Sequence, residues 1–247
     1  MSEQLAALRL SSDRLRELAD VLDDRALARS AYPTDWSVAD VLSHIGSGAV
    51  IMARRLEDSL RGLETPDAFA PAVWDEWNAK KDSAKAADGL AADRAYVERL
   101  EALNEAERAS LVFVMGPLRL GFDDAVSLRL NEHALHTWDV EVAFNPSAVI
   151  PDAIVAEVID HLEMIAGFTA RPTGATETVV VATTDPERRF RVSLTPDAVS
   201  FAAAPAASAD GDADTTVPAE QWIRLVYGRL DPADGVLQKL VPVFPGP

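Results

Sequence analysis

The chain has 247 residues, of which 48% are hydrophobic, and its formal net charge is −17. This length allows one large domain or two small ones, and the acidic excess argues against a nucleic-acid partner, because it leaves no basic surface for phosphates. Cysteine is absent, which excludes disulfides, cysteine-based zinc sites and a cysteine nucleophile, so any reactive thiol must come from outside the chain.

Helical periodicity dominates the first half of the chain, beginning with leucines at helical spacing from Leu5 to Leu22. This stretch has no basic region followed by an apolar block, as a signal peptide would. No apolar run in the sequence approaches the ~18–20 residues of a membrane span. We therefore expect a cytoplasmic protein without a membrane partner, as a monomer or small homo-oligomer.

Further helical regions are expected at residues 37–62, 74–109 and 121–144. Ser37 followed three residues later by Asp40 resembles a capping box, which predicts the start of the first of these regions. Gly89 marks a candidate break in the second region. One more amphipathic helix is expected at residues 152–168, and by sequence it could belong to either half of the chain.

Strand patterns follow. Two β-branched runs at 178–184 and 190–195 flank an Asp185-Pro186 turn and predict a hairpin, and residues 198–203 predict a third strand. A polar stretch contains an Asp210-x-Asp212-x-Asp214 run, but it lacks the glycine and final glutamate of a calcium loop, so we interpret it as solvated. A helix is expected around Trp222.

This order of elements predicts an α plus α+β fold. We expect a four-helix bundle at residues 1–148 followed by a small α+β domain at residues 149–247.

Two polar residues of the 121–144 helix, Glu132 and His136, are four apart and share one face of it. Phe122, Ala125, Val140 and Ala143 lie on the same side of the helix, so the two polar residues are within an apolar stripe. Burying an unpaired carboxylate costs several kcal/mol unless a cation or several donors compensate. His44 lies at the edge of the apolar stripe of the helix expected at 37–62, and a helical bundle can bring such side chains together around a metal. Two imidazoles and a carboxylate suit zinc with an open position, or iron, nickel or manganese.

Each of these residues also has a simpler explanation. His136 alone could be a hydrogen-bonded core histidine. Glu132 could pair with Arg129 or with an arginine of another helix, and His44 could be an ordinary helix-edge residue.

Two neighbours are candidates for supporting roles. Asp139 lies one turn beyond His136 and is expected to orient its imidazole, or else to pair with an arginine. His133 points away from His136 by helical geometry. It is expected to support a ligand from behind or to pair with a nearby carboxylate.

The segment from Asp35 to Ile45 (DWSVADVLSHI), with the later Glu132-x-x-x-His136-x-Trp138-Asp139, resembles the mycothiol-dependent maleylpyruvate isomerase family. That family belongs to the DinB-like metal-binding four-helix bundles. The resemblance is specific in the first half and weaker in the second, where residues 213–219 and 222–229 carry it.

The resemblance implies a DinB-like bundle at residues 1–148 and a sterol-carrier-protein-like α+β domain at 149–247. It also implies a divalent metal, usually zinc, held by His44, Glu132 and His136. The family's second domain contributes an arginine near the active site, for which Arg229 is the best positional match and Arg224 a rival.

The implied function is that of an enzyme with mycothiol as its thiol cofactor or co-substrate. The metal lowers the pKa of the thiol, and the thiolate adds to an electrophilic substrate, for isomerisation of maleylpyruvate-like compounds or for S-transfer. Two alternatives stay open: a non-catalytic metal-containing binding or regulatory protein on the same fold, and binding of a lipid by the second domain.

Overall fold

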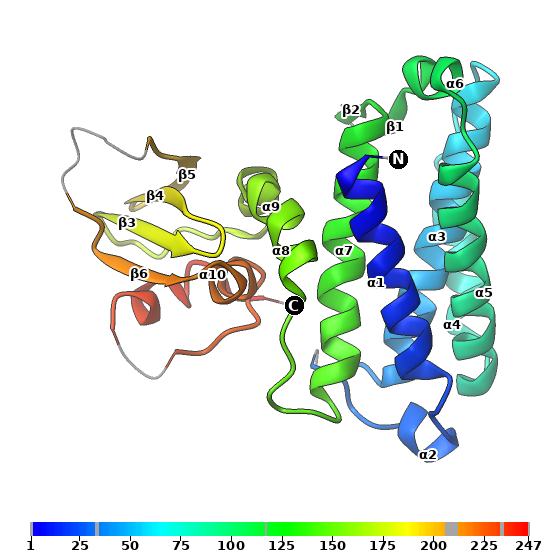
Figure 1. Cartoon of the computed structure of the whole chain (residues 1–247), viewed down its shortest axis with the longest axis horizontal. Helices are drawn as coiled ribbons and strands as arrows, with labels where there is room; N and C mark the ends of the chain where they lie inside the picture. The colour runs from blue at the N-terminus through cyan, green and yellow to red at the C-terminus, as the bar shows by residue number, and fades with distance from the viewer. Residues whose placement is uncertain (1, 33–34, 117, 206–211, 233–234, 247) are drawn as a thin grey trace. The chain divides into compact units, whose positions relative to one another are not determined.

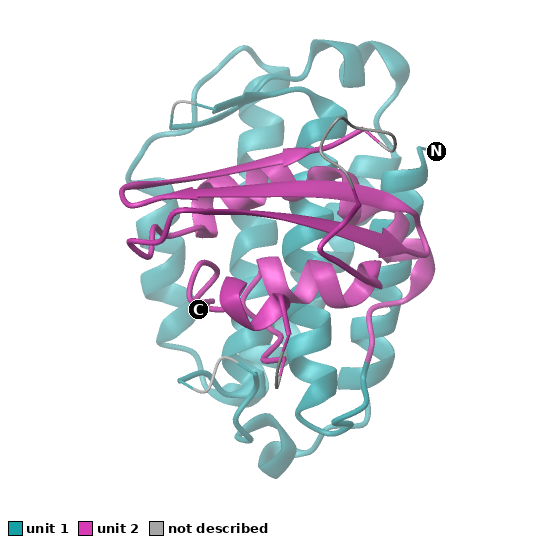
Figure 2. Ribbon diagram, turned by 90° about the vertical axis from the view of Figure 1, so that its left-hand side faces the viewer, with its two compact units in different colours: residues 1–148 teal, residues 149–247 magenta. Residues whose placement is uncertain are grey.

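The computed structural model describes residues 2–32, 35–116, 118–205, 212–232 and 235–246. The chain forms two compact units, residues 1–148 and 149–247, which Figure 2 draws in separate colours. Among the described residues, no helix is both long enough and apolar enough to cross a lipid bilayer.

The first unit is helical apart from one short hairpin (Figure 1). Its elements are α1 (Glu3–Ala19), α2 (Asp24–Leu27), α3 (Val38–Leu60), α4 (Phe69–Asn78), α5 (Asp82–Glu101), α6 (Glu105–Ser110), β1 (Phe113–Met115), β2 (Leu118–Leu120) and α7 (Phe122–Val142). The long helices α1, α3, α5 and α7 lie side by side, with α3 packed on α5 and α1 packed on α7. These four make the predicted bundle.

Helix α3 begins where the sequence predicts. The Ser37 side chain accepts a hydrogen bond from the Asp40 amide at 3.1 Å, and the Asp40 carboxylate accepts one from the Ser37 amide at 2.9 Å. Such a capping box satisfies two amides that the first turn leaves without partners, and an N-cap of this kind contributes about 1 kcal/mol. It therefore fixes where α3 starts and, two turns later, where His44 lies.

The helical region expected at 74–109 differs from the structure. This region is divided into α4, α5 and α6, and the first interruption of the helix lies between Asn78 and Asp82 instead of at Gly89. Gly89 lies inside α5, where a Cβ atom would be 2.4 Å from the carbonyl oxygen of Leu42. The glycine is needed for a close helix contact, which local propensity does not reveal.

The second unit combines helices with one four-stranded sheet (Figure 1). Its elements are α8 (Asp152–Val158), the 3₁₀ turn η1 (Ile159–His161), α9 (Leu162–Thr169), β3 (Glu177–Thr184), β4 (Arg188–Thr195), β5 (Ala198–Ala203), β6 (Thr215–Pro218), α10 (Ala219–Val226) and the 3₁₀ turn η2 (Leu237–Leu240). The sheet order is β5-β4-β3-β6, with β6 parallel to β3 and the other pairs antiparallel.

Aromatic side chains fill the space between the sheet and its helices. Trp222 of α10 lies 5.8 Å from Phe190 and 5.9 Å from Phe201, measured between ring centroids, and Phe244 closes the cluster at 6.5 Å from Trp222. One face of the sheet is therefore the core of this unit. Together the bundle and this sheet unit confirm the predicted α plus α+β class.

The structure of this unit differs from the prediction in two places. The helix predicted at 152–168 is interrupted by the turn η1, and the short strand β6 lies in a segment where no strand is predicted. Of the aspartate run, Asp210 lies outside the described residues. Asp214 accepts a hydrogen bond from the Val180 amide at 2.8 Å, so at least this aspartate ties the segment to the sheet.

Candidate metal centre

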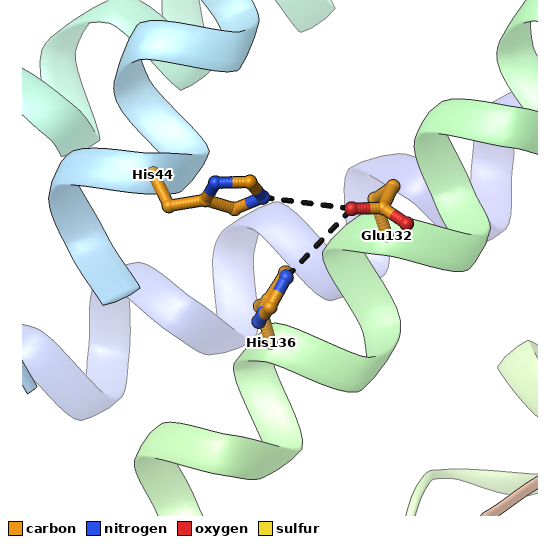
Figure 3. Close-up of side chains that lie close together, drawn as sticks. All are labelled: His44, Glu132 and His136. Atoms are coloured by element: carbon orange, nitrogen blue, oxygen red, sulfur yellow. Dashed lines mark ion pairs between the residues drawn. The ribbon is translucent and has the colours of Figure 1, made fainter. Parts of the chain in front are cut away.

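His44, Glu132 and His136 meet where α3 and α7 pack together (Figure 3). His44 extends from α3, while Glu132 and His136 lie one turn apart on α7 and extend towards it. Glu132 Oε2 lies 3.5 Å from His44 Nε2 and 3.7 Å from His136 Nε2. One ligand atom from each residue lies within 4.8 Å of the other two. The structure thus brings together the three residues that the sequence predicts as ligands.

The spacing of these donor atoms fits a bound cation. Two ligand atoms at ~2.1 Å from a tetrahedral zinc ion are about 3.4 Å apart, close to both distances measured from the Glu132 oxygen. Two imidazoles and one carboxylate are also a donor set that zinc accepts while keeping a position open for water or substrate. The three residues therefore suit a single divalent ion.

Their protonation states also favour metal binding. Partial burial raises the pKa of the Glu132 carboxyl, but the neighbouring His136 and His44 lower it by more, so the net pKa is below the ordinary range. Partial burial lowers the pKa of His44, and Glu132 opposes that effect only in part. An anionic carboxylate and a neutral imidazole are the forms that bind metals.

The centre is open on one side. The side chains of His44 and Glu132 are 39% and 45% exposed. The sequence predicts a Glu132 buried within an apolar stripe, and in this respect the prediction is wrong. Exposure leaves room for a ligand next to the three donors.

Asp139 holds the ring of His136 from behind. Its Oδ2 atom lies 2.8 Å from His136 Nδ1, and the residue is fully buried. Because a carboxylate oxygen can only accept, Nδ1 donates to Asp139, and Nε2, on the side of Glu132, is the ring atom that could bind a metal. Asp139 lies where the sequence predicts an orienting carboxylate.

Trp36 is a neighbour of the site whose role the sequence analysis missed. Its ring lies 6.0 Å from the His136 ring at an interplanar angle of 22°, and 5.2 Å from the His44 ring, between centroids. It covers both imidazoles from the segment just before α3. The signal in the sequence was the position of Trp36, an aromatic residue just before the helix that carries His44.

His133 belongs to a different cluster. Its Nδ1 atom lies 2.8 Å from Ser11 Oγ and 3.1 Å from Thr137 Oγ1, and its Nε2 atom lies 3.1 Å from Asp93 Oδ2. Of the two roles expected for His133, the structure shows the second: His133 is the partner of a nearby carboxylate, that of Asp93.

Arg129, which the sequence offered as a partner of Glu132, pairs with Asp93 instead, at 2.7 Å. That simpler explanation of Glu132 is therefore wrong, and the ion pairs of Glu132 are with His44 and His136.

The two arginines predicted near the site lie in the second unit. Arg224 of α10 forms a bidentate pair with Glu220, with distances of 2.7 and 3.1 Å. Arg229 is buried, and its Nη1 atom donates to the Tyr227 carbonyl at 2.9 Å. A role for either residue at the metal centre stays a prediction.

The chain matches one family model in sequence and two solved structures in fold. Residues 8–141 match the family model described as the mycothiol maleylpyruvate isomerase N-terminal domain. No curated protein matches the sequence.

Two solved structures share the fold. One is the mycothiol-dependent maleylpyruvate isomerase, with 15% sequence identity and a TM-score of 0.66. The other is a mutant of the mycothiol-dependent maleylpyruvate isomerase with one histidine replaced by alanine, with 13% identity and a TM-score of 0.67. Each likeness covers 94% of this chain and 90% of the other. At these identities it shows the fold alone.

Proposed function

This chain belongs to the mycothiol maleylpyruvate isomerase family, and we propose that it is a metal-dependent enzyme that uses a low-molecular-weight thiol, mycothiol, as cofactor or co-substrate. Residues 1–148 are the proposed metal-binding domain, and residues 149–247 are proposed as its sterol-carrier-protein-like partner. The observation that carries the proposal is the convergence of His44, Glu132 and His136 on one point with an open side.

The proposed ion is divalent, and zinc is our choice because of the donor set. Held by these ligands, it would supply a Lewis acid that lowers the pKa of a thiol, so that the thiolate is present at neutral pH.

The residues around the centre have complementary tasks. Glu132 supplies negative charge, and Asp139 keeps a proton on Nδ1 of His136, so that Nε2 stays available as a ligand. Trp36 covers the imidazole rings. The exposed edges of His44 and Glu132 leave a path for the thiol and the electrophile. Since the chain has no cysteine, the reactive sulfur arrives with the cofactor.

The proposed chemistry is addition of the thiolate to an electrophilic carbon. With a maleylpyruvate-like substrate, the thiolate adds to the double bond, the resulting single bond rotates, and the thiolate leaves to give the trans isomer. In S-transfer, the sulfur stays attached to the substrate, and the carbanion formed by the addition takes up a proton from solvent. From the family resemblance, in which Arg229 is the best positional match, we propose Arg229 as the residue that binds a substrate carboxylate.

The first test is elemental analysis of the purified chain beside His44→Ala, with His161→Ala as the control that removes a histidine outside the three ligands. We expect about one divalent ion per chain, lost in His44→Ala and retained in the control. The loaded protein is then assayed with mycothiol for isomerisation of maleylpyruvate and for S-transfer. Full metal content in His44→Ala would refute the metal centre. Metal without any response to thiols would instead favour a non-catalytic binding protein.

A further inference from the structure

A buried ion pair joins three helices next to the proposed metal centre. Arg129 lies one turn before Glu132 on α7, and Asp93 lies on α5. They are only 6% and 2% exposed. The Nη2 atom of Arg129 donates to Asp93 Oδ1 at 2.7 Å and to the carbonyl oxygen of Ile45 at 2.9 Å. One guanidinium group therefore links α7 to α5 and to α3.

Asp93 is held firmly in this arrangement. Its Oδ2 atom accepts a hydrogen bond from Ser12 Oγ at 2.6 Å and lies 3.1 Å from His133 Nε2. Burial raises the pKa of the Asp93 carboxyl, but His133 and Arg129 lower it more, so the pKa lies well below the ordinary range. The carboxylate therefore stays ionised, and Arg129 has a fixed partner.

Stability alone is a weak reason for such a pair, because well-packed apolar residues often stabilise a core as well as buried charges do. What the pair adds is a defined position for the group that it holds. That group is the carbonyl of Ile45, the residue directly after His44.

The same part of α3 is also fixed from the side of α5. A Cβ atom on Gly46 would lie 2.4 Å from the Cα atom of Gly89, and one on Gly89 would lie 2.4 Å from the carbonyl oxygen of Leu42. The two backbones therefore touch on either side of His44. Helix α3 is pressed against α5 here, while Arg129 holds it from α7.

We propose that Arg129, anchored by Asp93, is a positioning residue for metal binding: by holding the Ile45 carbonyl, it sets His44 against Glu132 and His136. This inference rests on the proposed metal centre. Both ligands on α7 move with Arg129, whereas His44 belongs to another helix and needs a bond between the helices to keep its place. Since metal–ligand distances tolerate changes of only about 0.2 Å, a small shift of this turn would weaken binding.

The test compares Arg129→Met with Leu56→Ala. Leu56 is fully buried on the same helix about three turns beyond His44, so its truncation lowers stability without touching Ile45. The affinity for Zn²⁺ is measured by competition with a chelator, at a temperature at which each metal-free variant is folded. The absorption spectrum of the Co²⁺-loaded protein reports the coordination geometry. Residues that support metal ligands typically change affinity about 10–100-fold.

We expect Arg129→Met to bind Zn²⁺ about tenfold more weakly or worse and to alter the Co²⁺ spectrum, while Leu56→Ala keeps the wild-type affinity and spectrum. If Arg129→Met loses stability but keeps both, the pair only stabilises the core and the inference is wrong.

Should Arg129→Met not fold, Gly48→Ala decides the question. A Cβ atom there would lie 3.1 Å from Arg129 Nη1, so the guanidinium has to shift by a few tenths of an ångström while every charge is kept. Weakened Zn²⁺ binding in this variant supports the inference, and unchanged binding overturns it.

The His44→Ala variant separates the two proposals. Metal retained in His44→Ala would refute the metal centre itself. Metal lost in His44→Ala but bound normally by Arg129→Met would refute only the positioning role.

Discussion

Replacing Asp139 by asparagine should weaken metal binding about tenfold while leaving the fold intact. Asparagine has the shape of aspartate, so the buried site keeps its volume. The side chain can still offer an oxygen to Nδ1 of His136, at the position where the carboxylate now lies 2.8 Å away. What the variant loses is the negative charge behind the ring.

The size of the effect follows from this contact. A hydrogen bond to a charged group contributes ~1.5–3 kcal/mol, and one between neutral groups contributes ~0.5–1.5 kcal/mol. The difference of about 1–1.5 kcal/mol corresponds to roughly a tenfold change in Kd. Asp139 is fully buried, so water does not screen the charge, and the upper half of this interval applies.

The assay is competition for Zn²⁺ with a chelator near neutral pH, with Asp58→Asn as the matched control. Asp58 is a buried carboxylate of α3 that accepts hydrogen bonds from Arg54 and Thr65. It touches none of the three ligands, so the control should keep the wild-type affinity. A Kd for Asp139→Asn within a factor of about two of wild type would show that the charge does not support His136.

Three further outcomes are expected. Trp36→Ala should weaken Zn²⁺ binding several-fold and Trp36→Phe should not, because phenylalanine keeps a ring against the imidazoles. Equal affinities of the two variants for Zn²⁺, measured by competition with a chelator, would contradict this expectation. The gap in unfolding free energy between wild type and Asp93→Asn, from urea titrations, should be constant above pH ~5 and shrink below pH ~4, because the folded-state pKa of Asp93 lies below the unfolded value of about 3.9. A gap that persists unchanged to pH ~2 would refute that linkage. Gly89→Ala should lower the unfolding free energy by ~1–3 kcal/mol or more, because its Cβ atom clashes with Leu42. Gly167→Ala in α9, where a Cβ atom meets open space, should raise the unfolding free energy by ~0.5 kcal/mol. Equal shifts in melting temperature for the two variants would contradict the proposed helix contact.

Local rules were enough to predict where α3 begins and which α7 side chains share a face. Ser37 and Asp40 are three residues apart, and Glu132 and His136 are four apart, so short-range geometry places each pair.

Other features depend on partners far away in the chain. Gly89 reads as a helix breaker by propensity, but its contact with Leu42 of another helix decides its role. The link between Asp93 and Arg129 spans two helices, and neither residue has a sequence signature. Strand β6 has four residues and pairs in parallel with β3, so its existence depends on a strand that is already in place.

The division of the ligands between α3 and α7 bears on how long the protein persists in the cell. In the folded chain, an ion bound to both helices would hold together the two ends of a segment that contains α4, α5 and α6. Ligand binding raises apparent stability by RT ln(1 + [L]/Kd), which is about 2.7 kcal/mol at a hundredfold excess over Kd. Under metal starvation, the empty chain would unfold more often and be degraded sooner, so that its abundance would follow the supply of metal.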